Sequence, residues 1–340
     1  MSSVQSKIER MWFVSTMAAA YAILLFFVST RAVTCFSIAS HSIIAPRRIA
    51  TLSTKTTCLY LQPVEDPNAK LSTKSLAGVL YEDVLQGLYR LYPPSDYADR
   101  NAVSRAGGYW PFIKDGEEPP LELTYGEFDL PFFAEILDAA HRFSNIDTNA
   151  GPTWAGKTFC DIGSGTGRLV VSAAALHPNL AMSRGVEYVE SCHDLAVKMM
   201  WKCRKGLAVT EDRSLPLAPM DLTCGSIGDP ATFIGDVDVA FVSSSAMPAE
   251  VLEMISRAVG MQCKVGTIVV STDYEIPTEG VVDGMTYRLE LLDTMDGYCW
   301  IVGGTSTAYF YRLAKSCSSP APPPLPIVSE PTPTPDQLLF

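Results

Sequence analysis

The first residues that could support chemistry form a glycine-rich run bracketed by two acids. Asp161-Ile-Gly-Ser-Gly-Thr-Gly167 ends the strand-like stretch that begins at residue 157, and Glu187 lies 26 residues after Asp161, directly behind Gly185 and Val186. Glycines let the backbone turn sharply and approach a ligand closely. In doubly wound sheets, ligands bind at the carboxyl end of the first strand, where this loop falls. The pattern predicts a small-molecule site.

The two acids distinguish between possible ligands. A nicotinamide fingerprint needs a third glycine at position 168, which is arginine, and the Asp161 carboxylate would repel a pyrophosphate. S-adenosylmethionine (SAM) is cationic at sulfur and carries an ammonium, so an acid before the glycines favours it, and Glu187 could accept both ribose hydroxyls. A tight strand–helix turn without a ligand is the simpler alternative, but the pattern is more specific than that. We therefore predict SAM as the cofactor, and we expect Arg168 to face solvent.

Strands and helices alternate around this loop. The apolar patterns predict helices over 76–92, 129–143, 166–176, 190–205 and 248–259, and strands over 157–163, 179–189, 219–227, 237–245 and 264–272. Such repeats imply a parallel sheet covered on both faces, because parallel neighbours need crossover connections. After residue 286 the helices stop, and 287–295 and 306–314 predict an antiparallel hairpin with Trp300 between its arms. A polar loop is expected from Tyr109 to Pro120.

Residues 120–313 resemble the class I SAM-dependent methyltransferases in this motif and element order. The resemblance implies an α/β fold with a Rossmann-like, doubly wound, seven-stranded and mostly parallel sheet ending in an antiparallel hairpin, preceded by a helical N-terminal extension. Within that class the chain is most similar to the Dot1-like lysine methyltransferases, which have a Tyr-Gly-Glu about 35 residues before the glycines, as at Tyr125-Gly126-Glu127.

Four further segments carry the Dot1-like resemblance: Gly185-Val186-Glu187, 239–244, 266–271, and Trp300 ahead of Tyr309-Phe310-Tyr311. The chain departs from the family at three points. Gly225-Ser226-Ile227 replaces Gly-Asp-Phe beside the adenine, Ser243-Ser244 replaces an Asn pair, and no basic histone- or DNA-binding extension is present. Ser226 could still bond the adenine amine and Ile227 could pack on the base.

The resemblance implies the following site. Asp161 and Glu127 hold the amino-acid end of SAM, the glycine backbone passes beneath it, Glu187 binds the ribose, and Ser226 and Ile227 frame the adenine. The predicted cofactor-binding residues are Tyr125, Glu127, Asp161, Gly163, Ser164, Gly165, Thr166, Gly167, Glu187, Ser226, Ile227 and Ser243. Tyr125, Ser243 and Ser244 are candidates for the side on which the acceptor enters.

The predicted reaction is in-line methyl transfer to a protein lysine or another amine, for which positioning supplies most of the acceleration. No residue stands out as an obligatory base. The alternatives are a SAM-binding module without catalysis and a methyltransferase acting on a small molecule or lipid. No metal is expected, because the nine cysteines include no CxxC pair and the four histidines share no motif. Cys160, Cys224 and Cys263 are interpreted as small buried hydrophobes.

Charge is distributed unevenly along the chain. The formal net charge is −11, but residues 1–64 hold six basic residues and one acid, which leaves −16 for residues 65–340. Because residues 65–340 are strongly acidic, they gain little affinity for nucleic acid from counterion release. General nucleic-acid binding is therefore not expected.

The two ends have compositions unlike the rest. Lys7 and Arg10 precede an apolar run at 11–29, as in a signal peptide, and 36–64 lacks acids but is rich in Ser, Thr and Arg, as in a transit peptide. A bipartite leader of this kind predicts plastid import by the secretory route; a secretory or membrane-anchored protein is the alternative, because about 19 apolar residues can span a bilayer. No stable membrane span is expected once the leader is removed.

Eight of the 24 prolines fall within residues 316–340, which predicts a disordered tail that a partner could bind. The expected organisation is a signal peptide (1–35), a transit-like segment (36–65), a helical N-terminal extension (66–120), a methyltransferase domain (121–315) and the Pro-rich tail (316–340). The methyl acceptor is not identified by the sequence.

Overall fold

A computed structural model describes residues 74–144, 154–299 and 304–317. The chain divides into two compact units, Met1–Pro67 and Asn68–Phe340, and all described residues belong to the second. The predicted signal peptide, the transit-like segment, residues 318–340 of the Pro-rich tail and Trp300 lie outside the described residues.

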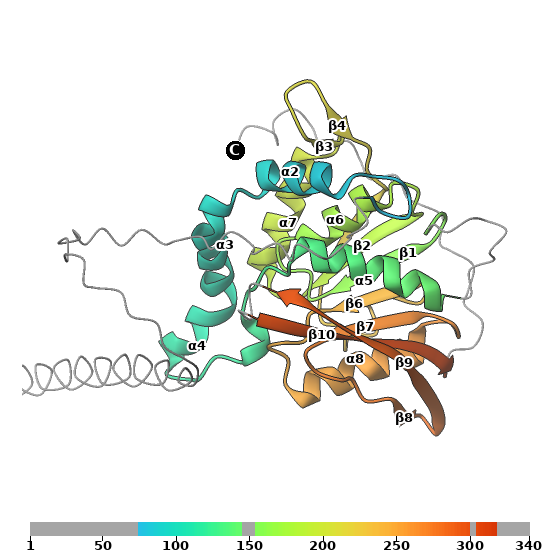
Figure 1. Ribbon diagram of the computed structural model, residues 1–340. Coiled ribbons are helices and arrows are strands. Elements are labelled where there is room, and N and C mark those ends of the chain that lie inside the picture. The colour runs from blue at the N-terminus through green and yellow to red at the C-terminus, as the bar shows by residue number, and fades with distance from the viewer. Residues whose placement is uncertain (1–73, 145–153, 300–303, 318–340) are drawn as a thin grey trace, which may run out of the picture. The chain divides into compact units, whose positions relative to one another are not determined.

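An eight-stranded sheet with the order β5-β2-β1-β6-β7-β10-β9-β8 forms the centre of this unit (Figure 1). Its strands are β1 (Thr158–Ile162), β2 (Met182–Glu187), β5 (Met220–Cys224), β6 (Val239–Val242), β7 (Ile268–Thr272), β8 (Glu279–Val282), β9 (Met285–Cys299) and β10 (Gly304–Lys315). The neighbouring strands β5, β2, β1, β6 and β7 run parallel to one another. β10 pairs antiparallel with β7 and with β9, and β9 and β10 form the predicted hairpin. The predicted fold class is confirmed.

The sheet has one strand more than the predicted seven. The additional strand is β8, which pairs antiparallel with β9 at the sheet edge. Asp283 and Gly284 connect the two strands, and both have positive φ, at 51° and 77°. Asp-Gly in this conformation is a preferred two-residue hairpin turn, because its twist matches that of the strands.

Helices cover both faces of the sheet. One face packs against α2 (Tyr81–Leu91), α5 (Leu130–Phe143), α6 (Arg168–Leu176) and α7 (Glu190–Lys202), and the other against α8 (Ala249–Gln262). Along β1, Phe159 contributes to the first core, whereas Cys160 and Ile162 contribute to the second. Successive side chains of a strand point to opposite faces, so a fully buried strand is apolar on both.

The helices begin where the sequence favours it. Asp129 caps α5 by accepting a hydrogen bond from the Phe132 N–H at 3.1 Å, and Pro131 occupies the first turn, where its missing N–H has no cost. Gly167, at φ 77°, precedes the first residue of α6. These predicted helices are confirmed with small shifts at their ends.

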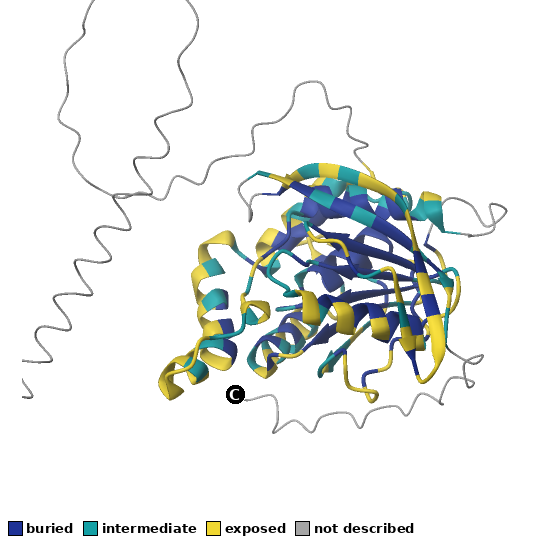
Figure 2. Ribbon diagram, turned by 90° about the horizontal axis from the view of Figure 1, so that it is seen from below, coloured by how far each residue is buried: buried dark blue, intermediate teal, exposed yellow. Residues whose placement is uncertain are grey.

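The polar loop expected from Tyr109 to Pro120 is wrong for residues 109–115, which are helical, whereas residues 116–120 do form a connection without helix. The helical segment comprises α3 (Tyr97–Ser104), a π-helical turn (Arg105–Tyr109) and α4 (Trp110–Asp115), flanked by 3₁₀ turns at Pro94–Asp96 and Leu121–Leu123. Figure 2 shows these short helices largely exposed beside the buried sheet. A small hairpin of β3 (Leu207–Ala208) and β4 (Ser214–Leu215) completes the unit.

The cysteines follow their expected role with one exception. Cys160 and Cys263 are buried in the core, but Cys224 is exposed, because β5 is the edge strand of the sheet. Within the described ranges, no helix combines the length and the apolar character that crossing a membrane requires.

Candidate functional site

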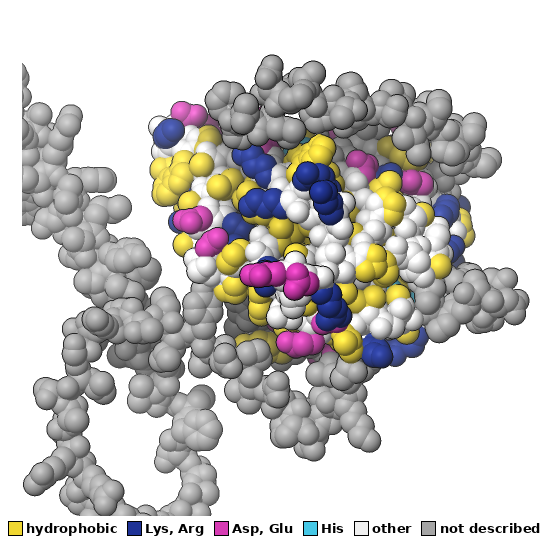
Figure 3. Space-filling view, turned by 90° about the horizontal axis from the view of Figure 1, so that it is seen from above, with side chains coloured by type: hydrophobic (Ala, Val, Ile, Leu, Met, Phe, Trp, Pro, Cys, Tyr) yellow, Lys and Arg dark blue, Asp and Glu magenta, His cyan; other side chains and the backbone are white. Residues whose placement is uncertain are grey.

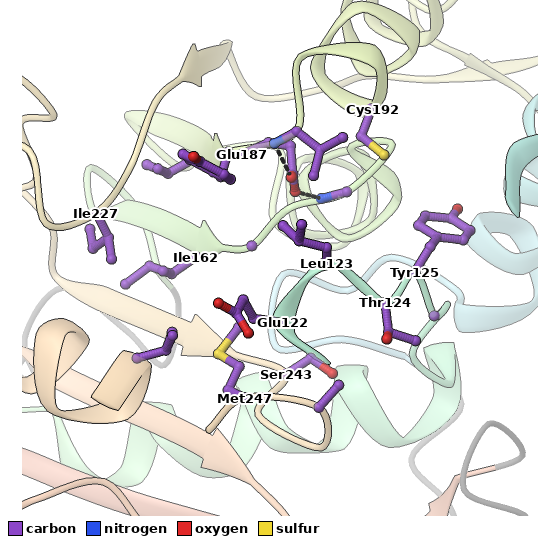
Figure 4. A pocket seen from close by; sticks show the side chains of 18 of the residues that line it. Glu122, Leu123, Thr124, Tyr125, Ile162, Glu187, Cys192, Ile227, Ser243 and Met247 are labelled. Carbon is purple, nitrogen blue, oxygen red and sulfur yellow. Dashed lines mark hydrogen bonds between the residues drawn. The ribbon is translucent and has the colours of Figure 1, made fainter. Parts of the chain in front are cut away.

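A cavity of about 470 Å³ lies over the carboxyl ends of the parallel strands. Its floor includes Ile162 at the end of β1 and Val186 in β2, and Ser243 follows β6 at its edge. The segment 122–126 forms one wall, and Val251, Met254 and Ile255 of α8 form another. Figure 4 shows side chains from these separate elements converging on one space.

The glycine loop, residues 163–167, turns tightly beneath this cavity. Gly163, Gly165 and Gly167 have φ of 82°, 54° and 77°, in the region that other residues rarely adopt. A Cβ at Gly165 would lie 3.2 Å from the Tyr125 ring. The loop therefore needs glycine for its conformation and for its approach to the opposite wall.

Glu187 holds the glycine loop from the neighbouring strand. Its Oε2 accepts a hydrogen bond from the Gly165 N–H at 2.6 Å, and its Oε1 accepts one from the Val189 N–H at 2.7 Å (Figure 4). Burial raises the pKa of the Glu187 carboxyl, and the backbone donors partly oppose this. A carboxylate has about four acceptor positions, so Glu187 retains acceptor capacity toward the cavity that it lines.

Asp161 is buried behind the cavity floor, with 3% of its surface exposed. Burial first, and the neighbouring Glu187 charge second, raise the pKa of Asp161 to about 8. The two acids predicted to act together are thus close enough to interact. A cation placed near them would favour the ionised form of both.

Tyr125 lines the cavity, and its hydroxyl donates to Glu127 Oε1 at 2.7 Å. The same hydroxyl lies 2.9 Å from Thr166 Oγ1 in the glycine loop. Burial and the Glu127 charge raise the pKa of Tyr125, so the phenol stays protonated. Glu127 itself is buried outside the cavity lining and pairs with arginine instead.

Arg168 is not solvent-facing as expected. Its Nη1 donates to the Phe128 carbonyl at 2.7 Å, its Nε lies 3.9 Å from Glu127 Oε2, and its side chain is only 11% exposed. The first turn of α6 packs beside the segment that carries Glu127, which is not visible from local sequence.

Ser226 and Ile227 line the far end of the cavity, where the adenine is predicted to lie. The Ser226 hydroxyl accepts a hydrogen bond from the Gly228 N–H at 3.2 Å, and the residue is half-buried. On the side where the acceptor is predicted to enter, Ser243 lines the cavity. The buried Ser244 side chain donates to the Thr272 carbonyl and lies 3.2 Å from the Tyr274 carbonyl, so it joins β6 to the end of β7 rather than facing the cavity.

The predicted residues therefore divide into two groups. On the cavity wall lie Tyr125, Gly163, Gly165, Glu187, Ser226, Ile227 and Ser243. Behind it lie Glu127, Asp161, Ser164, Thr166, Gly167 and Ser244. Direct contact of the second group with a cofactor stays a prediction.

Sequence reasoning missed several wall residues. Glu122 reaches into the cavity opposite Ile162, and Met247 projects beside it (Figure 4). Phe112, Leu123 and Cys192 also line the wall. The proximity of Glu122 to Tyr125 in the sequence was the one available signal, because the others come from elements whose packing the sequence does not reveal.

The chain's own features fit SAM. The Ser164 Oγ is buried and has no hydrogen-bond partner in the part of the chain that the structure describes. The cavity contains the carboxylate of Glu187 above the glycine loop, and no Lys, Arg or His occurs among its described lining residues. A cationic nucleoside is compatible with this charge, whereas a pyrophosphate is not.

A comparison with models of protein families agrees with this assignment. Residues 121–284 match the model of the family described as "Histone methylation protein DOT1". Among solved structures, the chain is similar to an RNA methyltransferase from Salinibacter ruber in complex with S-adenosyl-L-homocysteine, at 18% identity over 55% of this chain and 95% of that one, with a TM-score of 0.34. The rRNA methyltransferase aviRa from Streptomyces viridochromogenes has 14% identity over 55% and 86%, with a TM-score of 0.39.

No curated protein matches the sequence. At these low identities and TM-scores the structural likeness carries no weight, and the assignment rests on the family model and on the geometry of the site. Residues 121–284, just under half of the chain, match the DOT1 family model, and this chain is an enzyme that uses SAM to transfer methyl groups.

Proposed function

We propose that the acceptor is a primary amine, most simply the side chain of a protein lysine. The observation that carries this proposal is the charge of the cavity wall. Glu122 and Glu187 are its charged side chains, and no basic side chain occurs among the described lining residues. Such a wall attracts an ammonium and disfavours phosphate or carboxylate acceptors.

Glu122 is the residue best placed to receive that ammonium. It is exposed in the cavity, on the wall opposite the end of β1, and it is separate from the Glu187 carboxylate that holds the glycine loop (Figure 4). An exposed carboxylate can pair with an incoming ammonium and can help the ammonium to release a proton to water. Transfer requires that proton to leave, because only the neutral amine is a nucleophile.

The rest of the wall suits an aliphatic stem. Phe112, Leu123, Met247 and Val251 give the cavity a mainly apolar surface around Glu122. A lysine carries a four-carbon stem that can lie on such a surface while its ammonium reaches a carboxylate. A lipid or pigment precursor would match the apolar part of the wall but would leave Glu122 unpaired.

When bound, SAM supplies a methyl group on a sulfonium, and the chain supplies position. Gly165 and Glu187 shape the floor, Tyr125 forms the wall nearest the glycine loop, and Ile162 and Val186 exclude water beneath. Holding an amine within about 3 Å of the methyl carbon, in line, accounts for most of the acceleration in such transfers.

Labelled SAM and a fractionated plastid extract test the proposal. We expect label in protein, stable to base and located on lysine by mass spectrometry. The Glu122→Gln variant should raise the KM for the acceptor by about tenfold while leaving the Kd for SAM unchanged. Label only in lipid or in small molecules would contradict the amine proposal, and SAM binding without any turnover would support a non-catalytic module.

The Asp161→Ala variant tests the cofactor site itself. Calorimetry should show weaker SAM binding, because the variant removes the buried carboxyl whose ionised form a cationic cofactor favours. Unchanged affinity would contradict the assigned role of Asp161.

We further propose that the protein acts in a plastid, reached by the secretory route. The support is the composition of residues 1–65, an apolar run followed by an acid-free stretch rich in Ser, Thr and Arg. A fluorescent protein fused behind residues 1–65 should enter the plastid, and retention in the endoplasmic reticulum or secretion would contradict it.

The charge on one face of the described residues gives no support for a nucleic-acid partner. Figure 3, which looks down on the side of α2 and the β3–β4 hairpin, shows basic and acidic side chains interspersed on this face. A continuous basic surface, which gives phosphate backbones their affinity, is absent from this view.

A further inference from the structure

Helix α3 has a polar buried face. Its two buried residues are Arg100 and Ser104, one turn apart, with 3% and 2% of their surfaces exposed, while Ala98 and Ala102 face solvent. A surface helix normally buries an apolar stripe. A buried arginine costs desolvation that only good partners offset, so its position in α3 requires an explanation beyond packing.

Arg100 is linked to the glycine loop through two side chains. Its Nε lies 2.5 Å from Glu127 Oε1, which also accepts the Tyr125 hydroxyl at 2.7 Å. That hydroxyl is 2.9 Å from Thr166 Oγ1 in the loop. Arg100 therefore fixes the acceptor that orients Tyr125, and Tyr125 forms part of the cavity wall.

A second set of contacts holds Arg100 itself. Its Nη1 donates to the Pro93 carbonyl at 2.9 Å, and its guanidinium lies 5.9 Å from the centroid of the Tyr92 ring. The Tyr92 hydroxyl donates to the Thr166 carbonyl at 2.9 Å. The guanidinium is thus clamped between the end of α2 and the segment that carries the cavity wall.

The same helix reaches the other side of the cavity. Ser104 lines the cavity, and the Ser191 hydroxyl at the start of α7 donates to the Val103 carbonyl at 3.0 Å. A Cβ at Gly107 would meet the Ser191 hydroxyl at 2.2 Å, so the π-helical turn needs glycine for this approach. Figure 1 shows α3 beside α7 at one end of the sheet.

One donor of Arg100 is unused. Its Nη2 is buried and has no hydrogen-bond partner among the described residues. An unsatisfied buried donor on a charged group is unfavourable for stability, so its presence in α3 calls for an explanation.

We infer that Arg100 is a positioning residue for the cofactor. It holds Glu127, and through Glu127 it fixes Tyr125 against the glycine loop, so the helical N-terminal extension is part of the SAM site although it lies outside residues 121–284. This inference concerns cofactor binding and holds whatever the methyl acceptor is.

The test measures the Kd for SAM and the Tm of R100Q, R100K, Y125F and the R100Q/Y125F double variant, in the full chain. R100Q should weaken SAM binding by about tenfold or more, and R100K should weaken it less, since an ammonium keeps the charge but loses the planar fork. The Kd for SAM of the double variant should exceed that of Y125F by no more than about twofold, because Arg100 acts through Tyr125.

The matched control is R213Q. Arg213 forms a two-point ion pair with Asp83 of α2, so it also ties an arginine to the helical extension, but neither residue lines the cavity. R213Q should lower the Tm while leaving the Kd for SAM within about twofold of the wild type. This separates loss of stability from loss of cofactor positioning.

Wild-type affinity in R100Q, or effects of R100Q and Y125F that add in full, would overturn the inference. If R100Q does not fold, R100K decides: a weakening of about threefold or more is expected because one ammonium cannot bond both Glu127 and the Pro93 carbonyl in the same geometry, and wild-type affinity would overturn the inference.

Discussion

At the scale of single residues, the Asp161 carboxyl is expected to favour the binding of SAM but to lower the stability of the folded protein without cofactor. Its carboxyl is buried beneath the cavity floor, next to the Glu187 carboxylate, and its pKa is raised to about 8. Between its ordinary value of 3.8 and about 8, the folded protein keeps a proton that the unfolded chain has released. The free energy of unfolding therefore falls as the pH rises through this range.

The Asp161→Asn variant should be more stable than the wild type without cofactor. Asparagine has nearly the same shape and no proton to lose, so the penalty disappears. We expect a higher Tm at pH 7 to 8 and little difference at pH 4, measured by thermal unfolding across this pH range. A lower Tm at pH 8 would show that the ionised carboxylate is not destabilising.

The affinity for SAM should depend on the same proton. A cationic cofactor favours the ionised carboxylate, so in the wild type the Kd should fall as the pH rises from 6 to about 8, by up to about tenfold per pH unit, and then level off. Calorimetry at several pH values measures this slope, with Asp161→Asn as the control. Equal slopes in both proteins would assign the pH dependence to another group.

The residue types of the site could be predicted from sequence better than their positions. Asp161 and Glu187 were recognised from their charge and spacing, and they do lie together. That Glu127 and Ser244 face away from the cavity was not predictable, because their directions depend on Arg100 in α3 and on carbonyls at the end of β7 and just after it, which are remote in sequence.

At the scale of elements, the glycine loop combines left-handed backbone conformation with close packing. Gly165 has φ 54°, and a Cβ there would lie 3.2 Å from the Tyr125 ring. Gly156 has φ 70° but no atom within 4 Å of its Cβ position. A side chain would therefore strain the backbone at both Gly165 and Gly156, but only at Gly165 would it also contact another side chain.

Gly165→Ala and Gly156→Ala should therefore lose similar stability, roughly 1–2 kcal/mol each, in denaturant unfolding. Only Gly165→Ala should weaken SAM binding, by about tenfold or more, since it displaces Tyr125 from the loop. Equal effects of both variants on the Kd would show that the loop responds to global stability rather than to local shape.

The elements with a strong apolar pattern were predicted well, and those without one were missed. β1 is buried throughout and α6 is buried except at Arg168, and both sequences are mainly apolar. Helix α3, with the sequence YADRNAVS, buries Arg100 and Ser104, so no hydrophobic periodicity marks it. The edge strand β8 has an exposed Val281 and only four residues, and its Asp283-Gly284 turn was the remaining signal.

At the scale of the whole molecule, the unit that folds is larger than the family model. The model begins at residue 121, yet Val84 and Leu88 of α2 are fully buried in the core shared with α5 and α6. Tyr92, at 2% exposure, bonds the glycine loop from the same side. The core is therefore incomplete without the helical extension.

A protein that begins at residue 121 should lack a cooperative unfolding transition, whereas one that begins at residue 68 should bind SAM with a Kd within about twofold of the full chain. Circular dichroism during thermal unfolding and calorimetry compare the two. A stable, SAM-binding protein starting at residue 121 would contradict the importance of α2 and α3.

The polar inner face of α3 has a practical consequence. With little apolar surface holding it down, α3 should open locally at low free energy, because water can solvate Arg100 and Ser104 once the helix detaches. A protease would then cut near Ala102 before reaching the sheet. If cofactor binding keeps the helix docked, the rate of this cut measures SAM occupancy directly, so candidate inhibitors can be ranked before any acceptor has been identified.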